Sequence, residues 1–119
     1  MSRAVQALRA EGIGPGDRIA AIVTNDVEAI ALYLASAAIG AIWASCSPDF
    51  GPAGASDRLS QIAPQILFAV PGYGYAGKRF DVTASIDAVA ATPSIRKVVT
   101  LGRPGGSYAK PAVDFEDWL

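Results

Sequence analysis

Four short segments of mainly β-branched and apolar residues recur along the chain, and the stretches between them can each hold a helix. This rhythm is typical of consecutive βα units, in which the strands run parallel and the helices cross over the sheet. The sequence therefore predicts an α/β fold with an open, mostly parallel sheet of about four strands and helices on both faces. The four predicted strands are residues 18–24, 42–46, 65–70 and 96–101.

The whole chain, residues 1–119, is predicted to form one structural unit. The βα units occupy residues 1–102, and residues 103–119 are interpreted as a loop and a short terminal segment with a helical turn. Because ligands of such sheets bind outside the carboxyl ends of the strands, the loops of interest are those after Thr24, Cys46, Val70 and Leu101.

Helices are predicted over residues 2–11, 26–39, 52–63 and 81–91. The second has the clearest ends, because Asn25 can cap its N-terminus and Gly40 can end it at the C-terminus. In the third, Leu59 and Ile62 are the expected anchors, and Asp81 is the expected cap of the fourth. The side of the second helix expected to pack carries Val27, Ile30, Ala31, Leu34 and Ala38.

The balance of charges and the lack of histidine narrow the possible functions. Lys and Arg number 10 against 11 Asp and Glu, so we expect neither nucleic acid nor a membrane as a partner. The chain has no histidine, which excludes a Ser-His or Cys-His nucleophile within it. Cys46 is the only cysteine, so an internal disulfide is excluded and a reducing compartment, the cytoplasm, is expected.

A polar turn follows the second predicted strand. Residues 45–51 read Ser-Cys-Ser-Pro-Asp-Phe-Gly, and backbone amides and small hydroxyls at such a strand end can meet a phosphate or a nucleotide. The alternative is a tight turn without a ligand, because Ser and Asp bond their own backbone and Pro fixes φ. Cys46 is assigned to packing, since no base accompanies it.

A second candidate site follows the third predicted strand, over residues 71–79. It combines glycines and two tyrosines with the adjacent cations Lys78 and Arg79, which suits stacking on a base and holding a phosphate. It is not a Walker A loop, because no Ser or Thr follows its Gly-Lys pair. The alternative is an exposed loop whose cations are solvated and whose tyrosines cover the sheet edge.

Three further patterns are interpreted as structural. The glycines of residues 12–16 precede their strand, so they predict a turn and not a dinucleotide fingerprint. Asp57 and Arg58 are interpreted as a solvated helix face. The acidic residues near the end of the chain are interpreted as a charged surface, and no metal site is expected there.

The order of motifs carries a family resemblance over residues 5–101. Residues 16–20, Gly-Asp-Arg-Ile-Ala, and the helix segment after Asn25 are the more general part of it. The more specific part is residues 40–51, the run Asp-Arg-Leu-Ser-Gln-Ile at 57–62, and Gly72-Tyr73 with Gly77-Lys78-Arg79. In these motifs the chain resembles acetoacetyl-CoA synthetases, which are members of the adenylate-forming acyl-CoA ligase superfamily.

The resemblance implies a reaction with three small-molecule substrates. Acetoacetate, ATP and coenzyme A (CoA) are converted, with Mg²⁺, to acetoacetyl-CoA, AMP and pyrophosphate through an acyl-adenylate. In related synthetases the matching turn and basic loop lie near the CoA nucleotide. The resemblance therefore implies a CoA site that includes Ser47, Pro48, Asp49, Phe50, Tyr75, Lys78 and Arg79.

The resemblance also implies that much of the enzyme lies outside these residues. The family's Ser/Thr-Gly-rich phosphate loop, its later adenylate motif and its C-terminal domain with a lysine have no counterpart here. We therefore expect a fragment of the large N-terminal domain that has no catalytic residue, no activity and no tight cofactor binding on its own. An apolar patch left where such a fragment normally packs on the absent parts would favour its self-association. One alternative is a non-catalytic α/β binding or interaction module that self-associates, and another is a flavodoxin-like nucleotide binder.

Overall fold

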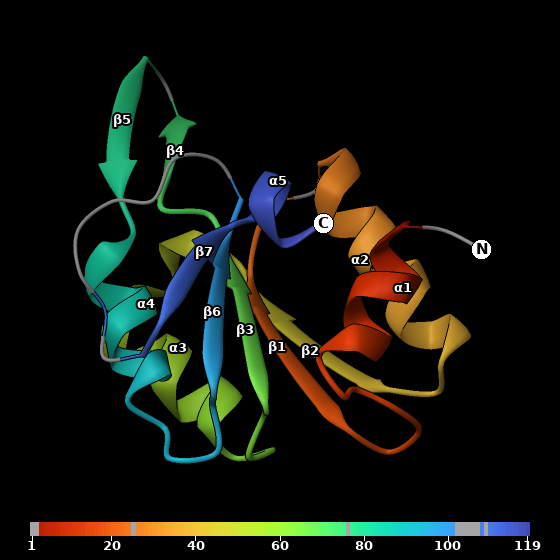
Figure 1. The fold of residues 1–119 in the computed structure, drawn as a ribbon. Helices are drawn as coiled ribbons and strands as arrows, with labels where there is room; N and C mark the ends of the chain where they lie inside the picture. The colour runs from red at the N-terminus through yellow and green to blue at the C-terminus, as the bar shows by residue number, and fades with distance from the viewer. Residues whose placement is uncertain (1–2, 25, 76, 102–107, 109) are drawn as a thin grey trace.

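The computed structural model describes residues 3–24, 26–75, 77–101, 108 and 110–119. At its centre is a five-stranded sheet in which all pairings are parallel and the strand order is β2-β1-β3-β6-β7 (Figure 1). All four predicted strands are confirmed, and the fifth, β7, lies in residues 103–119, for which the sequence predicts only a loop and a short terminal segment. The strands are β1 (Arg18–Ile22), β2 (Ile42–Cys46), β3 (Ile66–Ala69), β6 (Lys97–Thr100) and β7 (Ala112–Asp114).

The four predicted helices are also present, and a short helix ends the chain as expected. In addition, an antiparallel hairpin follows β3, and a single 3-10 turn, η1 (Pro48–Phe50), follows β2. The helices are α1 (Arg3–Ala10), α2 (Val27–Ala38), α3 (Gly51–Ser60), α4 (Thr83–Ala90) and α5 (Phe115–Trp118), and the hairpin strands are β4 (Gly72–Tyr75) and β5 (Lys78–Asp81).

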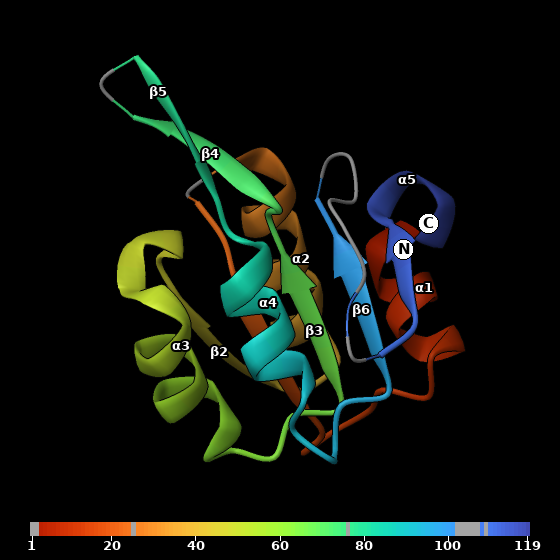
Figure 2. The same ribbon diagram turned by 90° about the vertical axis from the view of Figure 1, so that its left-hand side faces the viewer.

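Successive strand residues point to opposite sides, so the apolar strands present apolar side chains on both faces of the sheet. Helices cover both of these faces. Ile19 of β1 and Phe68 of β3 pack with α1, α2 and α5 in one core. Ile22 and Leu67, from the same two strands, pack with α3 and α4 in the other. Figures 1 and 2 show these two helix layers on either side of the sheet. The central strands are thus buried on both faces, as parallel sheets require.

The predicted packing side of α2 is wrong. Val27, Ile30 and Leu34 are 79%, 53% and 58% exposed, and Ala31 and Ala38 are exposed as well. Spacing could not identify the buried side because α2 is apolar around most of its circumference. The helix lies against the sheet through its smaller residues and one leucine, which are Ala29, Leu32, Ala35 and Ser36.

Ser36 explains part of this error. It is fully buried, although a polar residue normally marks the outer side of a helix. Its Oγ donates a hydrogen bond to the Leu32 carbonyl oxygen at 2.7 Å, so the hydroxyl is satisfied without water. A small serine therefore fits the side that approaches the sheet.

Two smaller predictions about helix ends are also corrected. α3 ends at Ser60, before Ile62, which lies half-buried in the following turn; Leu59 is the buried anchor. Asp81 belongs to β5, and the cap position of α4 is Val82. Asp81 still serves the helix start, because its Oδ1 accepts a hydrogen bond from the Thr83 backbone amide at 2.9 Å.

The cap of α2 is Asp26, whereas the predicted cap, Asn25, lies outside the described residues. Asp26 Oδ1 accepts a hydrogen bond from the Ala29 amide at 3.0 Å. Its other oxygen accepts one from the Thr24 hydroxyl at 2.9 Å. The carboxylate therefore satisfies the start of α2 and also fixes the loop that follows β1.

We expect Asp26→Ala to lower the free energy of unfolding by about 1 kcal/mol, because an open helix start loses its side-chain acceptor. Asp26→Asn is the matched control, since its amide oxygen can still accept from Ala29 and should retain most of the stability. Urea unfolding followed by circular dichroism measures both. Equal midpoints for wild type and Asp26→Ala would contradict the assigned cap.

Candidate functional site

The predicted site loops lie at one edge of the sheet, where the parallel strands end. The turn after β2 and the hairpin after β3 flank the loop after β1, because β1 lies between these strands in the sheet. The chain leaves β1 toward α2 on one face, and leaves β3 toward α4 on the other. Neighbouring loops that diverge in this way leave a crevice at the carboxyl edge, the usual ligand position in such folds.

The turn after β2 is built as its sequence predicts. Ser47 is extended, with φ −73° and ψ 148°, and Pro48 starts η1. The Phe50 amide donates to the Ser47 carbonyl oxygen at 3.2 Å, and Gly51 takes a φ of 77° that favours glycine. Pro48 is buried and shapes the turn, while Ser47 and Asp49 are exposed. Phe50 is 48% exposed, so an apolar ring faces solvent beside polar groups.

Arg58 corrects the prediction of a simply solvated helix face. Asp57 and Arg58 are both exposed, but the Arg58 Nε donates to the Ser45 carbonyl oxygen at 3.2 Å. The guanidinium carbon also lies 5.7 Å from the centre of the Phe50 ring, within cation–π range. The spacing Phe50, Gly54, Arg58 is a signal that could have revealed the contact with Phe50, because residues four apart share one side of a helix.

A pocket of about 450 Å³ lies at this edge. Arg58 supplies a positive charge to its wall, Thr24 and Ser47 supply hydroxyls, and Phe50 supplies an aromatic face. Thr24 is held by its hydrogen bond to Asp26. This combination suits a ligand with an anionic group and a planar or apolar part. The lining residues are Val23, Thr24, Ser45, Cys46, Ser47, Phe50 and Arg58.

Cys46 lines the floor of the pocket but is only 6% exposed. Burial raises the pKa of its thiol, and the Asp49 carboxylate acts in the same direction, while the Arg58 charge opposes them. A raised pKa keeps the thiol protonated at neutral pH, and the protonated form is a poor nucleophile. These properties are those of a packing residue.

The second candidate segment is a hairpin and not an irregular loop. Its residues alternate Gly-Tyr-Gly-Tyr in β4 and pair with β5 across a turn in which Gly77 has a φ of 76°. Tyr73 and Phe80 lie opposite each other, and their rings stack with centres 5.1 Å apart. Cross-strand aromatic pairs stabilise such hairpins. The glycines of this segment suggest a flexible loop, so the sequence did not predict the hairpin.

The hairpin projects beyond the sheet on the side of α3 and α4, as both views show (Figures 1 and 2). Lys78 is exposed at its outer end. Tyr75 and Arg79 belong to its strands, but their side chains lie outside the described part of the structure. The pocket is lined by the turn after β2, and the hairpin stands at the same sheet edge across the end of β1.

The described residues contain neither a metal-binding cluster nor a membrane-spanning helix. His, Cys, Asp and Glu do not gather there in any group of three or more that could hold a metal ion. Over the same residues, no helix is long and apolar enough to cross a lipid bilayer. The structure thus offers residues for an anionic organic ligand at the sheet edge, but no described cluster for Mg²⁺.

Comparison with known families identifies the class of protein. The model of the AMP-binding enzyme family matches residues 1–116. A parallel α/β sheet with a polar pocket at its carboxyl edge fits that match, and the chain belongs to this family. The match also excludes a flavodoxin-like protein unrelated to these ligases.

Particular relatives are acetoacetyl-CoA synthetases, which confirms the resemblance seen in the sequence. The chain is 58% identical to that of Rhizobium meliloti (strain 1021) over 114 residues, covering 96% of this chain and 18% of the relative. It is 44% identical to that of Danio rerio over 96 residues, covering 80% and 14%. The solved acetoacetyl-CoA synthetase from Streptomyces lividans has a TM-score of 0.87 and 35% identity, covering 97% of this chain and 18% of that one. The chain therefore spans less than a fifth of the length of these relatives.

Proposed function

We propose that this chain is a fragment of an acetoacetyl-CoA synthetase and forms part of the wall of its CoA site. The whole enzyme would convert acetoacetate, ATP and CoA to acetoacetyl-CoA, AMP and pyrophosphate through an acyl-adenylate. The observation that carries the proposal is the pocket at the carboxyl edge of the sheet, lined by Ser47, Phe50 and Arg58, in a chain 58% identical to such a synthetase. The cytoplasm is the proposed compartment.

The turn after β2 and the hairpin are proposed to bind the CoA nucleotide jointly. Exposed Ser47, Asp49 and Phe50 offer a hydroxyl, a carboxylate and a stacking face to its ribose and base. Lys78, with Tyr75 and Arg79, would offer positive charge and an aromatic ring from the hairpin. Two strand spacings, about 10 Å, separate the ends of β2 and β3, a span that suits an extended nucleotide. CoA supplies the thiol that accepts the acyl group.

Arg58 has a different proposed role, because it contacts the turn itself. Its hydrogen bond to the Ser45 carbonyl and its position over the Phe50 ring hold the end of β2 and η1 in one arrangement. Pro48, which is buried, contributes to the same arrangement. Both residues would act by positioning the exposed groups of the turn.

We propose that the isolated chain is inactive. Adenylate formation requires positive groups and Mg²⁺ fixed around the ATP phosphates, and the family motifs that supply them have no counterpart in this sequence. An assay of pyrophosphate release with acetoacetate, ATP and CoA tests this directly. Turnover by the 119 residues alone would overturn the proposal that they are a silent part of the enzyme.

The CoA site is tested in a chimera in which these residues replace the matching segment of the Rhizobium meliloti synthetase. We expect Lys78→Ala to raise the KM for CoA about tenfold, the size expected for one charge-assisted hydrogen bond, and to leave the KM for acetoacetate unchanged. Arg3→Ala removes an exposed cation from α1, across the sheet, and is the matched control. An unchanged KM for CoA in Lys78→Ala would remove the hairpin from the site.

A binding or interaction module that self-associates is the second candidate function. The specific observation in its favour is the exposed apolar side of α2, where Val27 is 79% and Leu34 58% exposed. Size-exclusion chromatography over a range of concentrations distinguishes the two candidates. A stable dimer without any effect of CoA would favour the module, and a monomer would favour the synthetase fragment.

A further inference from the structure

The loop after β1 is held in place by hydrogen bonds on both of its sides. The Val23 amide donates to the Cys46 carbonyl oxygen at 3.2 Å, which ties the loop to the end of β2. The Asp26 amide donates to the Thr24 carbonyl oxygen at 2.9 Å, and the Asp26 carboxylate accepts from the Ala29 amide at the start of α2. Thr24 therefore has a fixed position on the wall of the pocket.

The hydrogen bond between the side chains of Thr24 and Asp26 has only one possible direction. An ionised carboxylate accepts and cannot donate, and a threonine hydroxyl has a single hydrogen. Thr24 Oγ1 lies 2.9 Å from Asp26 Oδ2, so this hydrogen points to Asp26. Only the lone pairs of the hydroxyl oxygen remain for a ligand. In the pocket, Thr24 therefore accepts hydrogen bonds and does not donate them.

Arg58 gives the same pocket a wall of the opposite polarity. A guanidinium donates and cannot accept, and the hydrogen bond from Arg58 Nε to the Ser45 carbonyl oxygen fixes its position. The Phe50 ring, which is 48% exposed and 5.7 Å from the guanidinium carbon, adds a flat face. A planar ligand that fits this pocket presents a donor to Thr24 and an acceptor to Arg58.

The adenine base of CoA has this combination of groups, since its 6-amino group donates and its ring nitrogens accept. We propose that Thr24, oriented by Asp26, recognises the adenine of CoA by accepting a hydrogen bond from the 6-amino group. This inference rests on the proposed function and adds a specificity-determining residue to its CoA site. Asp26 is a positioning residue, because it acts on the base only through Thr24.

A base with a carbonyl group at position 6 would be disfavoured, because its lone pairs would face those of Thr24. The test therefore compares CoA with its analogue that carries hypoxanthine in place of adenine. Both are assayed as acyl acceptors with the Rhizobium meliloti chimera described above. The unsubstituted chimera is expected to prefer CoA by about tenfold in kcat/KM, as expected for an acceptor that loses its donor and meets a second acceptor.

Thr24→Val removes the hydroxyl and keeps the shape of the side chain. We expect it to raise the KM for CoA about fivefold, the size of one hydrogen bond between neutral groups, and to change the KM for the hypoxanthine analogue little. The preference for CoA should shrink accordingly. Thr24→Ser is the matched control, since it keeps the hydroxyl and should keep the preference.

Asp26→Asn tests the positioning role while keeping the helix cap. The asparagine oxygen can accept from the Ala29 amide, and its NH2 group then donates to Thr24 Oγ1. The Thr24 hydrogen is released to turn into the pocket, where it can donate to a 6-oxo group. We expect the preference for CoA over the analogue to fall about fivefold or more. A purely structural role of Asp26 would change stability and leave this preference as it is.

Equal use of the two acyl acceptors by the unsubstituted chimera would overturn the proposal. So would a loss in Thr24→Val that is the same for both, because Thr24 would then not read position 6. A raised KM for CoA in Lys78→Ala, with none in Thr24→Val, keeps the CoA site and removes Thr24 from it. A chimera without acetoacetate-dependent pyrophosphate release contradicts the proposed function itself, and this inference with it.

Discussion

Phe68→Ala is expected to lower the free energy of unfolding by about 3–5 kcal/mol, as large-to-small changes at fully buried aromatic sites do. Phe68 is 0% exposed and lies on β3, the middle strand of the sheet. Its ring centre is 6.4 Å from that of Trp43 and 5.2 Å from that of Trp118. Truncation would leave a cavity between Trp43 of the edge strand β2 and Trp118 of helix α5, and each also contacts another ring that it would have to leave in order to fill the cavity.

Phe80→Ala is the matched control for this prediction. Phe80 is 40% exposed and stacks on Tyr73 in the hairpin, so its loss should cost about 1 kcal/mol. Urea unfolding followed by circular dichroism measures both variants at the same pH. Similar losses of stability in the two variants would show that the core around Phe68 can close the gap.

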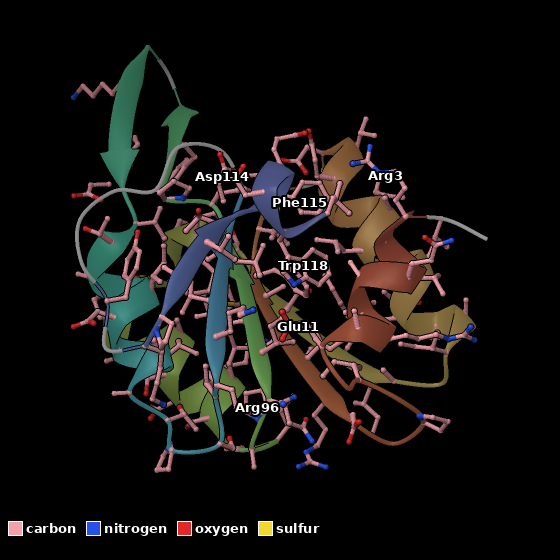
Figure 3. The ribbon with its side chains drawn as sticks, viewed as in Figure 1. Arg3, Glu11, Arg96, Asp114, Phe115 and Trp118 are labelled. Atoms are coloured by element: carbon pink, nitrogen blue, oxygen red, sulfur yellow. The ribbon has the colours of Figure 1, made fainter. Side chains whose placement is uncertain are left out.

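The second large effect is expected at Glu11, which links the two ends of the described chain. Its Oε1 accepts hydrogen bonds from Lys97 Nζ at 2.5 Å and Trp118 Nε1 at 3.0 Å. Its backbone carbonyl accepts one from Arg96 at 3.3 Å. Figure 3 shows Glu11 beside Trp118, between α1 and the sheet. We expect Glu11→Ala to lower the free energy of unfolding by about 2 kcal/mol, because Trp118 loses its acceptor and Lys97 loses its ion pair.

Glu11→Gln separates the charge from the hydrogen bond. A glutamine oxygen can still accept from Trp118, so the expected loss at neutral pH is smaller, about 1 kcal/mol, and comes from the partly exposed pair with Lys97. Equal stability of the wild type and both variants in urea unfolding would contradict a stabilising role for this contact.

The same residue gives an expected pH dependence. Burial raises the pKa of Glu11, but hydrogen bonds from Lys97 and Trp118 and the charges of Lys97 and Arg96 outweigh it and hold the pKa below its ordinary 4.5. A carboxyl with a lowered pKa in the folded state contributes its full stability above 4.5 and loses it as the pH falls through the folded pKa. The difference in stability between wild type and Glu11→Gln should therefore shrink below that pH.

The fold was predictable from sequence where burial dominates. The segments that became β1, β3 and β6 are buried on both faces along most of their length, and the edge strand β2 is only partly buried; all four segments are apolar enough to be assigned without knowledge of contacts. β7 was missed because its three residues are a strand only through pairing with β6. The packing side of α2 was predicted wrongly because an almost uniformly apolar helix has no side that spacing can select.

In the candidate site, too, features that depend on neighbouring residues could be predicted, and features that depend on tertiary contacts could not. Ser47 and Asp49 could be proposed from turn chemistry, which depends on neighbours in sequence. Arg58 could not be paired with the Ser45 carbonyl in this way, because that contact depends on how α3 folds back along β2. The hairpin was not predicted because its glycines are typical of a loop. The Tyr73–Phe80 stack that stabilises the hairpin joins residues from two strands, so it depends on their pairing.

The positions of the two tryptophans have a consequence for spectroscopy. The chain contains two tryptophans, and both Trp43 and Trp118 pack on the core shared by α1, α2 and α5. Intrinsic fluorescence therefore reports on one face of the sheet, and the core under α3 and α4 has no indole of its own. Agreement between fluorescence and circular dichroism during unfolding would mean that both cores melt as one cooperative unit, whereas an earlier fluorescence change would mean that the tryptophan-bearing layer separates first.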